Sequence, residues 1–163
     1  MIKKVVGNVI DVKAEVLINA SNGKGWMGGI FGSFFPQKGI AQTIHYADPS
    51  IERLAKRVAK SGSLECGDIF LTDSGKLDFP KGILHAVTMK KPGQLSNIKI
   101  VEDCLESILR FCEVNEVNSV AIPLLGTGTG KVDQKTVLKL YENKLSSSKT
   151  IFIIVSLQKT END

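Results

Sequence analysis

Two glycine-rich segments of this sequence combine the residue types that bind phosphate groups. The first, residues 19–32, places closely spaced glycines beside two asparagine amides, and the second, residues 124–131, alternates glycine with threonine. Glycines let backbone N–H groups approach a ligand closely, and N–H groups ahead of a helix attract anions. The two segments therefore predict a phosphate-binding site made of backbone N–H groups, amides and hydroxyls.

The second segment does not match the common nucleotide-binding motifs. A Walker A loop ending at Lys131 would need glycine at position 125 and serine or threonine at position 132, where this chain has Leu125 and Val132. The Rossmann fingerprint is also absent, since no G-x-G-x-x-G run leads from the first predicted strand into a helix. Either segment alone is also typical of an ordinary turn, but two at one edge of a sheet favour a ligand site.

The cysteines and histidines do not have the spacing of a metal site. Cys66, Cys104 and Cys112 match no zinc or redox motif, and the chain has 2 histidines and no H-E-x-x-H sequence. We expect reduced cysteines, with the last two packed in the core, and neither a bound metal nor a cofactor. His85 lies within an apolar run and His45 within a helical pattern, so both are predicted to be packing residues.

Composition limits the function further. The formal net charge of +4 comes mostly from lysine, with arginine only at positions 53, 57 and 110. This charge suits an anionic ligand but is too small and too poor in arginine to predict base-specific nucleic-acid recognition. The longest apolar run, residues 151–157, is far too short to span a bilayer, and residues 1–7 lack the pattern of a signal peptide. We expect a cytoplasmic protein with no membrane partner.

The elements that position these residues alternate between strands and helices. Strands are predicted at residues 2–9, 16–20, 69–71, 83–87, 120–123 and 151–157. Apolar spacing predicts helices over residues 49–59, 97–112 and 134–145, with Asp48, Ser96 and Asp133 as their N-caps. Strands that are apolar on both faces predict a central, mixed but largely parallel sheet in a three-layer α/β/α fold. We expect one domain over residues 1–158 and a disordered tail at 159–163.

In such folds, ligands bind beyond the carboxyl ends of the strands, where both glycine-rich segments fall. The ordered set of motifs resembles the macro domain family. The elements that carry the resemblance are Gly7-Asn8-Val9-Ile10, Asn19-Ala20-Ser21-Asn22, the first glycine-rich segment, Gly67-Asp68-Ile69, His85-Ala86-Val87, and Ala121-Ile122-Pro123 leading into Gly126-Thr127-Gly128. The resemblance implies the macro domain fold and the binding of ADP-ribose or an ADP-ribosylated macromolecule.

The resemblance also implies a role for individual positions. It places adenine near Asn8 and Val9, the distal ribose hydroxyls at Asn22, and one phosphate at the N–H groups of Gly28, Gly29 and Ile30. It places the other phosphate within residues 125–129. The full set of implied ligand-binding positions is Asn8, Val9, Asn19, Ala20, Asn22, Trp26, Gly28, Gly29, Ile30, Phe31, Leu125, Gly126, Thr127, Gly128, Thr129 and Gly130. Because large aromatics are poor turn residues, we interpret Trp26 and Phe31 as covering the ligand.

In detail the sequence looks most like the terminal ADP-ribose glycohydrolases, which include DNA ADP-ribosyl glycohydrolases. That similarity implies Lys90, Asp133 and Asn22 as catalytic residues in the removal of ADP-ribosyl groups from protein or nucleic acid. A lysine can trap the opened ribose aldehyde or act electrostatically, and an aspartate can move protons at the anomeric carbon. The alternatives are that Asp133 only caps a helix and that Lys90 lies in a solvated turn.

Other functions of the same fold stay open at this point. A non-catalytic module that binds ADP-ribose or poly-ADP-ribose is favoured by Met27 and Gly32, which stand where other members carry a histidine and an acid. An O-acetyl-ADP-ribose deacetylase, an ADP-ribose 1''-phosphate phosphatase, a poly(A) or nucleic-acid binder, and an unrelated phosphate-binding α/β enzyme are further alternatives. We expect a monomer that meets nucleic acid only as a modified substrate.

Overall fold

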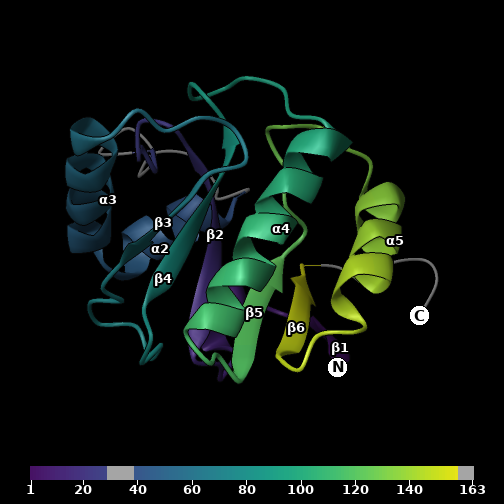
Figure 1. Ribbon diagram of the computed structural model, residues 1–163. Helices are drawn as coiled ribbons and strands as arrows, with labels where there is room; N and C mark the ends of the chain where they lie inside the picture. Colours follow the sequence, from purple (N-terminus) through teal and green to yellow (C-terminus); the bar gives the residue numbers. More distant parts are fainter. Residues whose placement is uncertain (29–38, 158–163) are drawn as a thin grey trace.

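The computed structural model describes residues 1–28 and 39–157. Its centre is a six-stranded sheet with the strand order β1-β6-β5-β2-β4-β3 (Figure 1). The strands are β1 (Ile2–Val6), β2 (Val16–Asn22), β3 (Ile69–Thr72), β4 (Ile83–Met89), β5 (Ser119–Pro123) and β6 (Ile151–Ser156). All neighbours pair in parallel except β3, which pairs antiparallel with β4 at the edge. The predicted mixed, largely parallel sheet is therefore confirmed.

Helices cover both faces of the sheet, as the three-layer prediction requires. The helices in the described part of the chain are α2 (Ile40–Ala47), α3 (Pro49–Ser61), α4 (Ile98–Val114) and α5 (Gln134–Leu145). Side chains alternate along β2, so Val16 and Ile18 pack with α4 and α5, whereas Leu17 packs with α2 and α3. Figure 1 shows the pair α4 and α5 on one side of the sheet and the pair α2 and α3 on the other.

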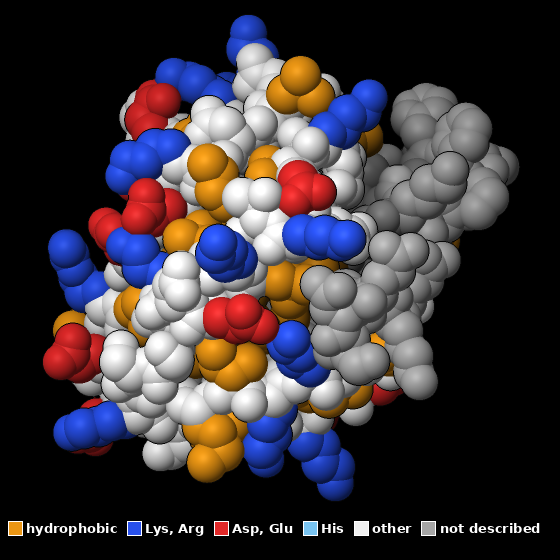
Figure 2. Space-filling model, turned by 90° about the vertical axis from the view of Figure 1, so that its right-hand side faces the viewer, with side chains coloured by type: hydrophobic (Ala, Val, Ile, Leu, Met, Phe, Trp, Pro, Cys, Tyr) orange, Lys and Arg blue, Asp and Glu red, His pale blue; other side chains and the backbone are white. Residues whose placement is uncertain are grey.

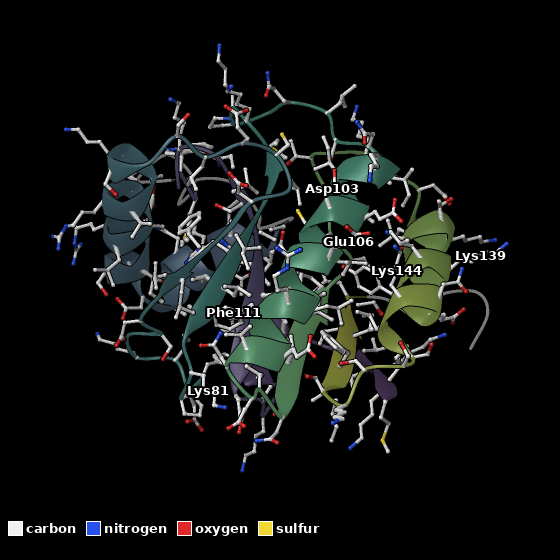
Figure 3. All side chains as sticks on the ribbon, viewed as in Figure 1. Lys81, Asp103, Glu106, Phe111, Lys139 and Lys144 are labelled. Atoms are coloured by element: carbon white, nitrogen blue, oxygen red, sulfur yellow. The ribbon has the colours of Figure 1, made fainter. Side chains whose placement is uncertain are left out.

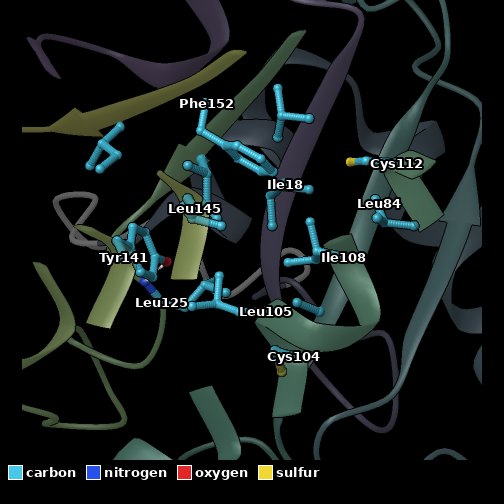
Figure 4. Packing of buried hydrophobic residues seen from close by; sticks show 14 of the residues in the cluster. Ile18, Leu84, Cys104, Leu105, Ile108, Cys112, Leu125, Tyr141, Leu145 and Phe152 are labelled. Atoms are coloured by element: carbon cyan, nitrogen blue, oxygen red, sulfur yellow. Dashed lines mark hydrogen bonds between the residues drawn. The ribbon is translucent and has the colours of Figure 1, made fainter. Parts of the chain in front are cut away.

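The layer under α4 and α5 contains the larger apolar cluster (Figure 4). Tyr141 is fully buried there, and its hydroxyl accepts a hydrogen bond from the Leu125 N–H at 3.0 Å and donates one to the Pro123 carbonyl at 2.8 Å. Cys104 and Cys112 face the same cluster from α4, with relative exposures of 0% and 2%. Burial raises the pKa of the Cys104 thiol to about 12. These two cysteines are core residues, as predicted.

The ends of several elements differ from the sequence predictions by one to three residues, and two of the differences concern residues with a predicted role. Val9 does not extend β1 but begins a short 3-10 turn, η1 (Val9–Asp11), which buries its side chain. The N-cap of α4 is Asn97 rather than Ser96, because the Asn97 Oδ1 accepts from the Ile100 N–H at 3.0 Å. Asp48 and Asp133 cap α3 and α5 as predicted.

The order of the strands determines where a site can form. Because β4, β2 and β5 are parallel neighbours, their carboxyl ends meet at one edge of the sheet. The loops that follow these strands contain the first glycine-rich segment, Lys90, and the second glycine-rich segment. Three segments that are far apart in the sequence are thus brought to the same edge, which is where open α/β sheets bind their ligands.

Candidate functional site

The connection between β4 and α4, residues 90–97, joins the two glycine-rich loops. At one end, the Gly23 N–H donates to the Met89 carbonyl at 3.0 Å, and a Cβ at Gly23 would lie 2.9 Å from the Lys90 carbonyl oxygen. At the other end, the Ser96 N–H donates to the Gly130 carbonyl at 3.0 Å. Figure 1 shows this connection crossing above the carboxyl ends of the strands. The three loops therefore form one continuous structure.

The side chain of Asn22 shapes the first loop. Its Oδ1 accepts from the N–H groups of Lys24 at 3.1 Å and Trp26 at 3.2 Å, and its Nδ2 donates to the Trp26 carbonyl at 2.8 Å. Asn22 is buried, with 6% of its surface exposed. In this arrangement the amide holds the loop closed on itself, and its expected contact with the distal ribose stays a prediction.

Glu52, a buried acid that the sequence analysis missed, accepts a hydrogen bond from the N–H of Met27 in the first loop. Glu52 on α3 is 3% exposed and contacts His45 of α2 at 2.5 Å and the Lys56 ammonium at 2.6 Å. Burial would raise the pKa of Glu52, but the hydrogen bonds from Lys56 and the Met27 N–H and the charge of Lys56 outweigh burial, so the pKa is lowered. The sequence signal that could have indicated this burial is the position of Glu52 on the same face of α3 as the apolar residues Ile51 and Ala55. His45 is thus a packing residue, as predicted, with a specific acidic partner.

The second loop carries backbone N–H groups that have no hydrogen-bond acceptor among the described residues. The N–H groups of Gly126, Gly128, Thr129 and Gly130 donate to no other residue that the structure describes. The Leu125 N–H is bound to Tyr141, and the Thr127 hydroxyl donates to the Leu124 carbonyl at 2.8 Å. Unsatisfied N–H groups that cluster beside the start of a helix form an anion-binding cradle. Within this loop, that cradle is the part suited to a phosphate.

Lys90 lies directly after β4, at the edge where the loops meet. Its ammonium donates to both carboxylate oxygens of Glu65, at 2.7 and 2.9 Å, and both side chains are more than half exposed. The hydrogen bond and the charge of Glu65 raise the pKa of Lys90. Lys90 is therefore cationic near neutral pH and suited to electrostatic stabilisation, whereas attack as a nucleophile needs loss of its proton.

Asp133 stands at the first turn of α5. Its Oδ2 accepts from both the N–H and the hydroxyl of Thr136, each at 2.8 Å. The hydrogen bonds from Thr136 lower the pKa of Asp133, so the exposed carboxylate is ionised near neutral pH. Its predicted role as a helix cap is confirmed, and its predicted catalytic role stays a prediction.

Asn19 and His85 belong to a polar chain inside the sheet. Asn19 Nδ2 lies 3.0 Å from His85 Nδ1, and His85 Nε2 lies 2.8 Å from the Thr72 hydroxyl. An amide nitrogen only donates, so Nδ1 accepts and Nε2 carries the proton. Burial lowers the pKa of His85 to about 3, so the ring is neutral and stacks on Phe70. His85 is a core histidine, as predicted, and Asn19 supports the strand from a fully buried position.

The other residues expected to contact the ligand differ in how far they are buried. Asn8 is half-buried at the N-cap of η1, beyond the carboxyl end of β1, and Ala20 is half-buried within β2. Trp26 is 42% exposed, whereas Met27 beside it is 2% exposed. Three expected contacts lie outside the described residues, namely Gly29, Ile30 and Phe31.

Over residues 1–28 and 39–157, no three His, Cys, Asp or Glu side chains come close enough to hold a metal ion. Every helix in the same residues is too short or too polar to cross a membrane.

Comparison with known sequences gives a consistent family. The sequence model of the Macro domain family matches residues 18–141. An uncharacterised protein of Aquifex aeolicus is 31% identical over 85% of this chain and 76% of its own length. A DNA ADP-ribosyl glycohydrolase of Mycobacterium tuberculosis is 30% identical over 80% of this chain, but this match covers only 35% of that relative.

Solved structures of macrodomains have the same fold as this chain. The macrodomain of Mycobacterium tuberculosis DarG superposes with a TM-score of 0.81 at 26% identity, covering 95% of this chain and 97% of that one. The macrodomain of Thermus aquaticus DarG superposes with a TM-score of 0.79, also at 26% identity and over 95% of this chain and 97% of that one. The fold described above is shared along nearly the whole length of these domains.

Proposed function

This chain belongs to the macro domain family, and we propose that the edge where β2, β4 and β5 end binds ADP-ribose. The observation that carries the proposal is the set of N–H groups of residues 126 and 128–130, which have no acceptor among the described residues and lie in the segment that leads to α5. Such a cradle neutralises a diphosphate without a metal ion. A solved relative, the DarTG protein of Thermosipho africanus, is described in complex with ADP-ribose and shares the fold with a TM-score of 0.76 at 21% identity.

We infer an orientation for the ligand from the positions of the loops. The diphosphate lies at the second loop, the adenine end reaches Asn8 beyond β1, and the distal ribose faces the segment after β4 that begins with Lys90. This orientation agrees with the strand order, because β1 and β4 lie on opposite sides of β5 and β2. The anomeric carbon of the distal ribose would then be the atom nearest Lys90.

We further propose that the domain releases ADP-ribose from an ADP-ribosylated macromolecule. Neutral Lys90 attacks the anomeric carbon, the bond from this carbon to the macromolecule breaks, and the macromolecule takes up the proton that the lysine nitrogen loses. Water then attacks the same carbon and the carbon–nitrogen bond breaks, with Asp133 passing the proton of water to the lysine nitrogen. If Lys90 stays charged, its ammonium donates the proton to the leaving atom while water attacks the carbon and Asp133 accepts the proton of water. Support comes from three relatives that match over 80% of this chain and are named DNA ADP-ribosyl glycohydrolases.

A second candidate is a binding module without turnover, and one observation favours it. Glu65 holds the Lys90 ammonium and Thr136 holds the Asp133 carboxylate, so both side chains have partners other than a ligand. Turnover would require Lys90 to leave Glu65. The two candidates share the ADP-ribose site and differ only in whether ADP-ribose is released from a modified macromolecule.

Calorimetric titration tests the shared claim. The protein is titrated with ADP-ribose, ATP and AMP under the same conditions, and we expect ADP-ribose to bind with micromolar affinity and at least tenfold more tightly than the other two. Equal affinity for all three would indicate a general phosphate or adenine site. No binding of ADP-ribose would contradict the proposed function and leave the family assignment standing.

We also propose that the domain is a monomer. On the face that carries α5 and the outer strands, apolar side chains are scattered among acidic and basic ones rather than gathered in a patch (Figure 2). Large apolar patches mark stable interfaces, whereas scattered apolar side chains are normal for a solvated surface. Light scattering at two protein concentrations checks this, and the expected mass is 17.7 kDa at both.

A further inference from the structure

Helix α3 carries a row of cations on one side. The residues that make up this row, here called the basic stripe, are Arg53, Lys56, Arg57 and Lys60. Their spacings of three and four residues place them next to one another on the helix surface, and all four are exposed. In Figure 3, side chains that end in nitrogen extend outward from α3, away from the sheet.

Within α3, only Lys56 of the basic stripe has an acidic partner. The only acid of α3 is Glu52, and its carboxylate is buried against His45 and Lys56. Arg53, Arg57 and Lys60 have no ion pair with another described residue. Two of the three arginines of the chain therefore lie together on one surface, with no acidic partner among the described residues.

A groove next to the basic stripe joins it to the candidate site. The groove is open, has a volume of about 570 Å³, and is lined by Lys24, Trp26, Lys56, Lys60 and Pro92. Trp26 is held in place through the Asn22 amide, and Pro92 follows Lys90 by two residues. The groove therefore opens beside the position where the bond to ADP-ribose would be broken.

The opposite side of the molecule is different. Where α4 and α5 pack together, Lys144 pairs with Glu102 at 2.8 Å and with Glu106 at 3.1 Å, and Lys99 pairs with Asp103 at 2.8 Å. Both signs of charge also alternate on the face shown in Figure 2. The basic stripe and its groove thus combine neighbouring cations on one helix with an exposed tryptophan.

We propose that the groove and the basic stripe bind a single-stranded nucleic-acid segment next to an ADP-ribosylated nucleotide. Lysine and arginine neutralise backbone phosphates, and an exposed indole stacks with an unpaired base. An acidic peptide would match the charge but would leave the Trp26 ring unused. The proposal rests on the proposed function, because it assigns the class of macromolecule from which ADP-ribose would be released.

The test is the fluorescence anisotropy of a labelled, unmodified 12-nucleotide thymidine strand titrated with the intact protein over a range of salt concentrations. We expect Arg53→Gln, Arg57→Gln and Lys60→Gln together to weaken binding at least tenfold. The slope of log Kd against log salt should fall by about 2, since each phosphate contact to a single strand contributes about 0.7. Trp26→Ala should weaken binding about tenfold with little change in that slope.

A matched control removes the same charge elsewhere. Lys3→Gln, Lys139→Gln and Lys149→Gln together replace three exposed lysines outside α3 and the groove, and Figure 3 shows Lys139 on the far side of the molecule. We expect less than a twofold change in strand binding. Equal weakening by the two triple variants would overturn the proposal, as would tighter binding of a poly-glutamate peptide than of the strand.

Titration of the same variants with free ADP-ribose separates this proposal from the proposed function. The triple variant of the basic stripe should bind free ADP-ribose within twofold of the wild type, because the cradle lies on the second loop. Failure of the wild type to bind ADP-ribose would refute the proposed function. The strand titration tests the groove whether or not the wild type binds ADP-ribose.

Discussion

The ammonium of Lys90 lies 2.7 Å from the Glu65 carboxylate, which joins the end of β4 to the segment that precedes β3. Glu65 is thus the partner that keeps the candidate catalytic lysine charged, and it raises the pKa of Lys90. The pair has a direct consequence for turnover, because a lysine attacks a carbon only in its neutral form.

Glu65→Gln should therefore lower the pKa of Lys90 and increase the neutral fraction at a given pH. If Lys90 acts as a nucleophile, we expect the rate of ADP-ribose release at pH 7 to rise about threefold to tenfold, with the pH–rate profile shifted to lower pH. Glu106→Gln is the matched control, since it removes a carboxylate that pairs with Lys144 between α4 and α5 (Figure 3). A lower rate with an unshifted profile in Glu65→Gln would show that Lys90 acts as a cation.

Gly25 is a position where a side chain cannot fit. Its φ is +64°, and a Cβ there would lie 2.6 Å from the backbone of Ala55 in α3. Gly25→Ala should push the first loop away from α3 and weaken ADP-ribose binding at least tenfold, measured by calorimetry. Gly62→Ala adds the same methyl group in open space at the end of α3 and should leave the affinity within twofold. Similar affinities for both variants would show that the position of the first loop does not matter for binding.

Glu52 connects the packing of α2 and α3 to the first loop. Glu52→Gln removes the charge that holds His45, Lys56 and the Met27 N–H, and we expect a loss of about 1–3 kcal/mol in the free energy of unfolding. Because the folded protein lowers the pKa of Glu52, this contribution is present above pH 4.5 and is lost as pH falls further. Urea unfolding at pH 7 measures the loss of stability in Glu52→Gln. The control is Glu113→Gln, which changes an exposed acid of α4 and should alter the free energy of unfolding by less than about 0.5 kcal/mol.

His85 makes stability depend on pH in a higher range. Its folded pKa is about 3, below the ordinary value of 6.5, so only the unfolded chain takes up this proton as pH falls below 6.5. The expected loss is about 2 kcal/mol between pH 7 and pH 5. His85→Phe keeps a ring against Phe70. Urea unfolding of this variant at pH 7 and pH 5 should show a free energy of unfolding that falls by about 2 kcal/mol less than in the wild type. An equally steep curve in the variant would assign the effect to other groups.

The fold could be predicted from the sequence because its signals are local. Continuous apolar runs located the strands, helical apolar spacing located α3 to α5, and Asp48 and Asp133 indicated where two helices begin. Val9 was misplaced, since its apolar side chain suits either a strand or a turn packed against the core. The loops could be assigned to one edge because parallel neighbours have their carboxyl ends together.

The partners of the site residues could not be predicted, since they depend on contacts between distant segments. Nothing in the sequence pairs Lys90 with Glu65, or the Met27 N–H with Glu52. The net charge of +4 likewise does not show its distribution: Lys144 pairs with acids of α4, whereas four exposed cations lie next to one another on α3. These relationships appear only when the helices are placed against the sheet.

The release of free ADP-ribose from ADP-ribosylated macromolecules is the most direct test of the account. Wild type, Lys90→Ala and Asp133→Asn are incubated with a single-stranded oligonucleotide and with a protein, each carrying an ADP-ribosyl group, and released ADP-ribose is quantified by chromatography. We predict release by the wild type, a loss of at least a hundredfold in Lys90→Ala and tenfold in Asp133→Asn, and unchanged calorimetric affinity for ADP-ribose. No release by the wild type from either substrate, with ADP-ribose still bound, would contradict the hydrolase and establish a binding module.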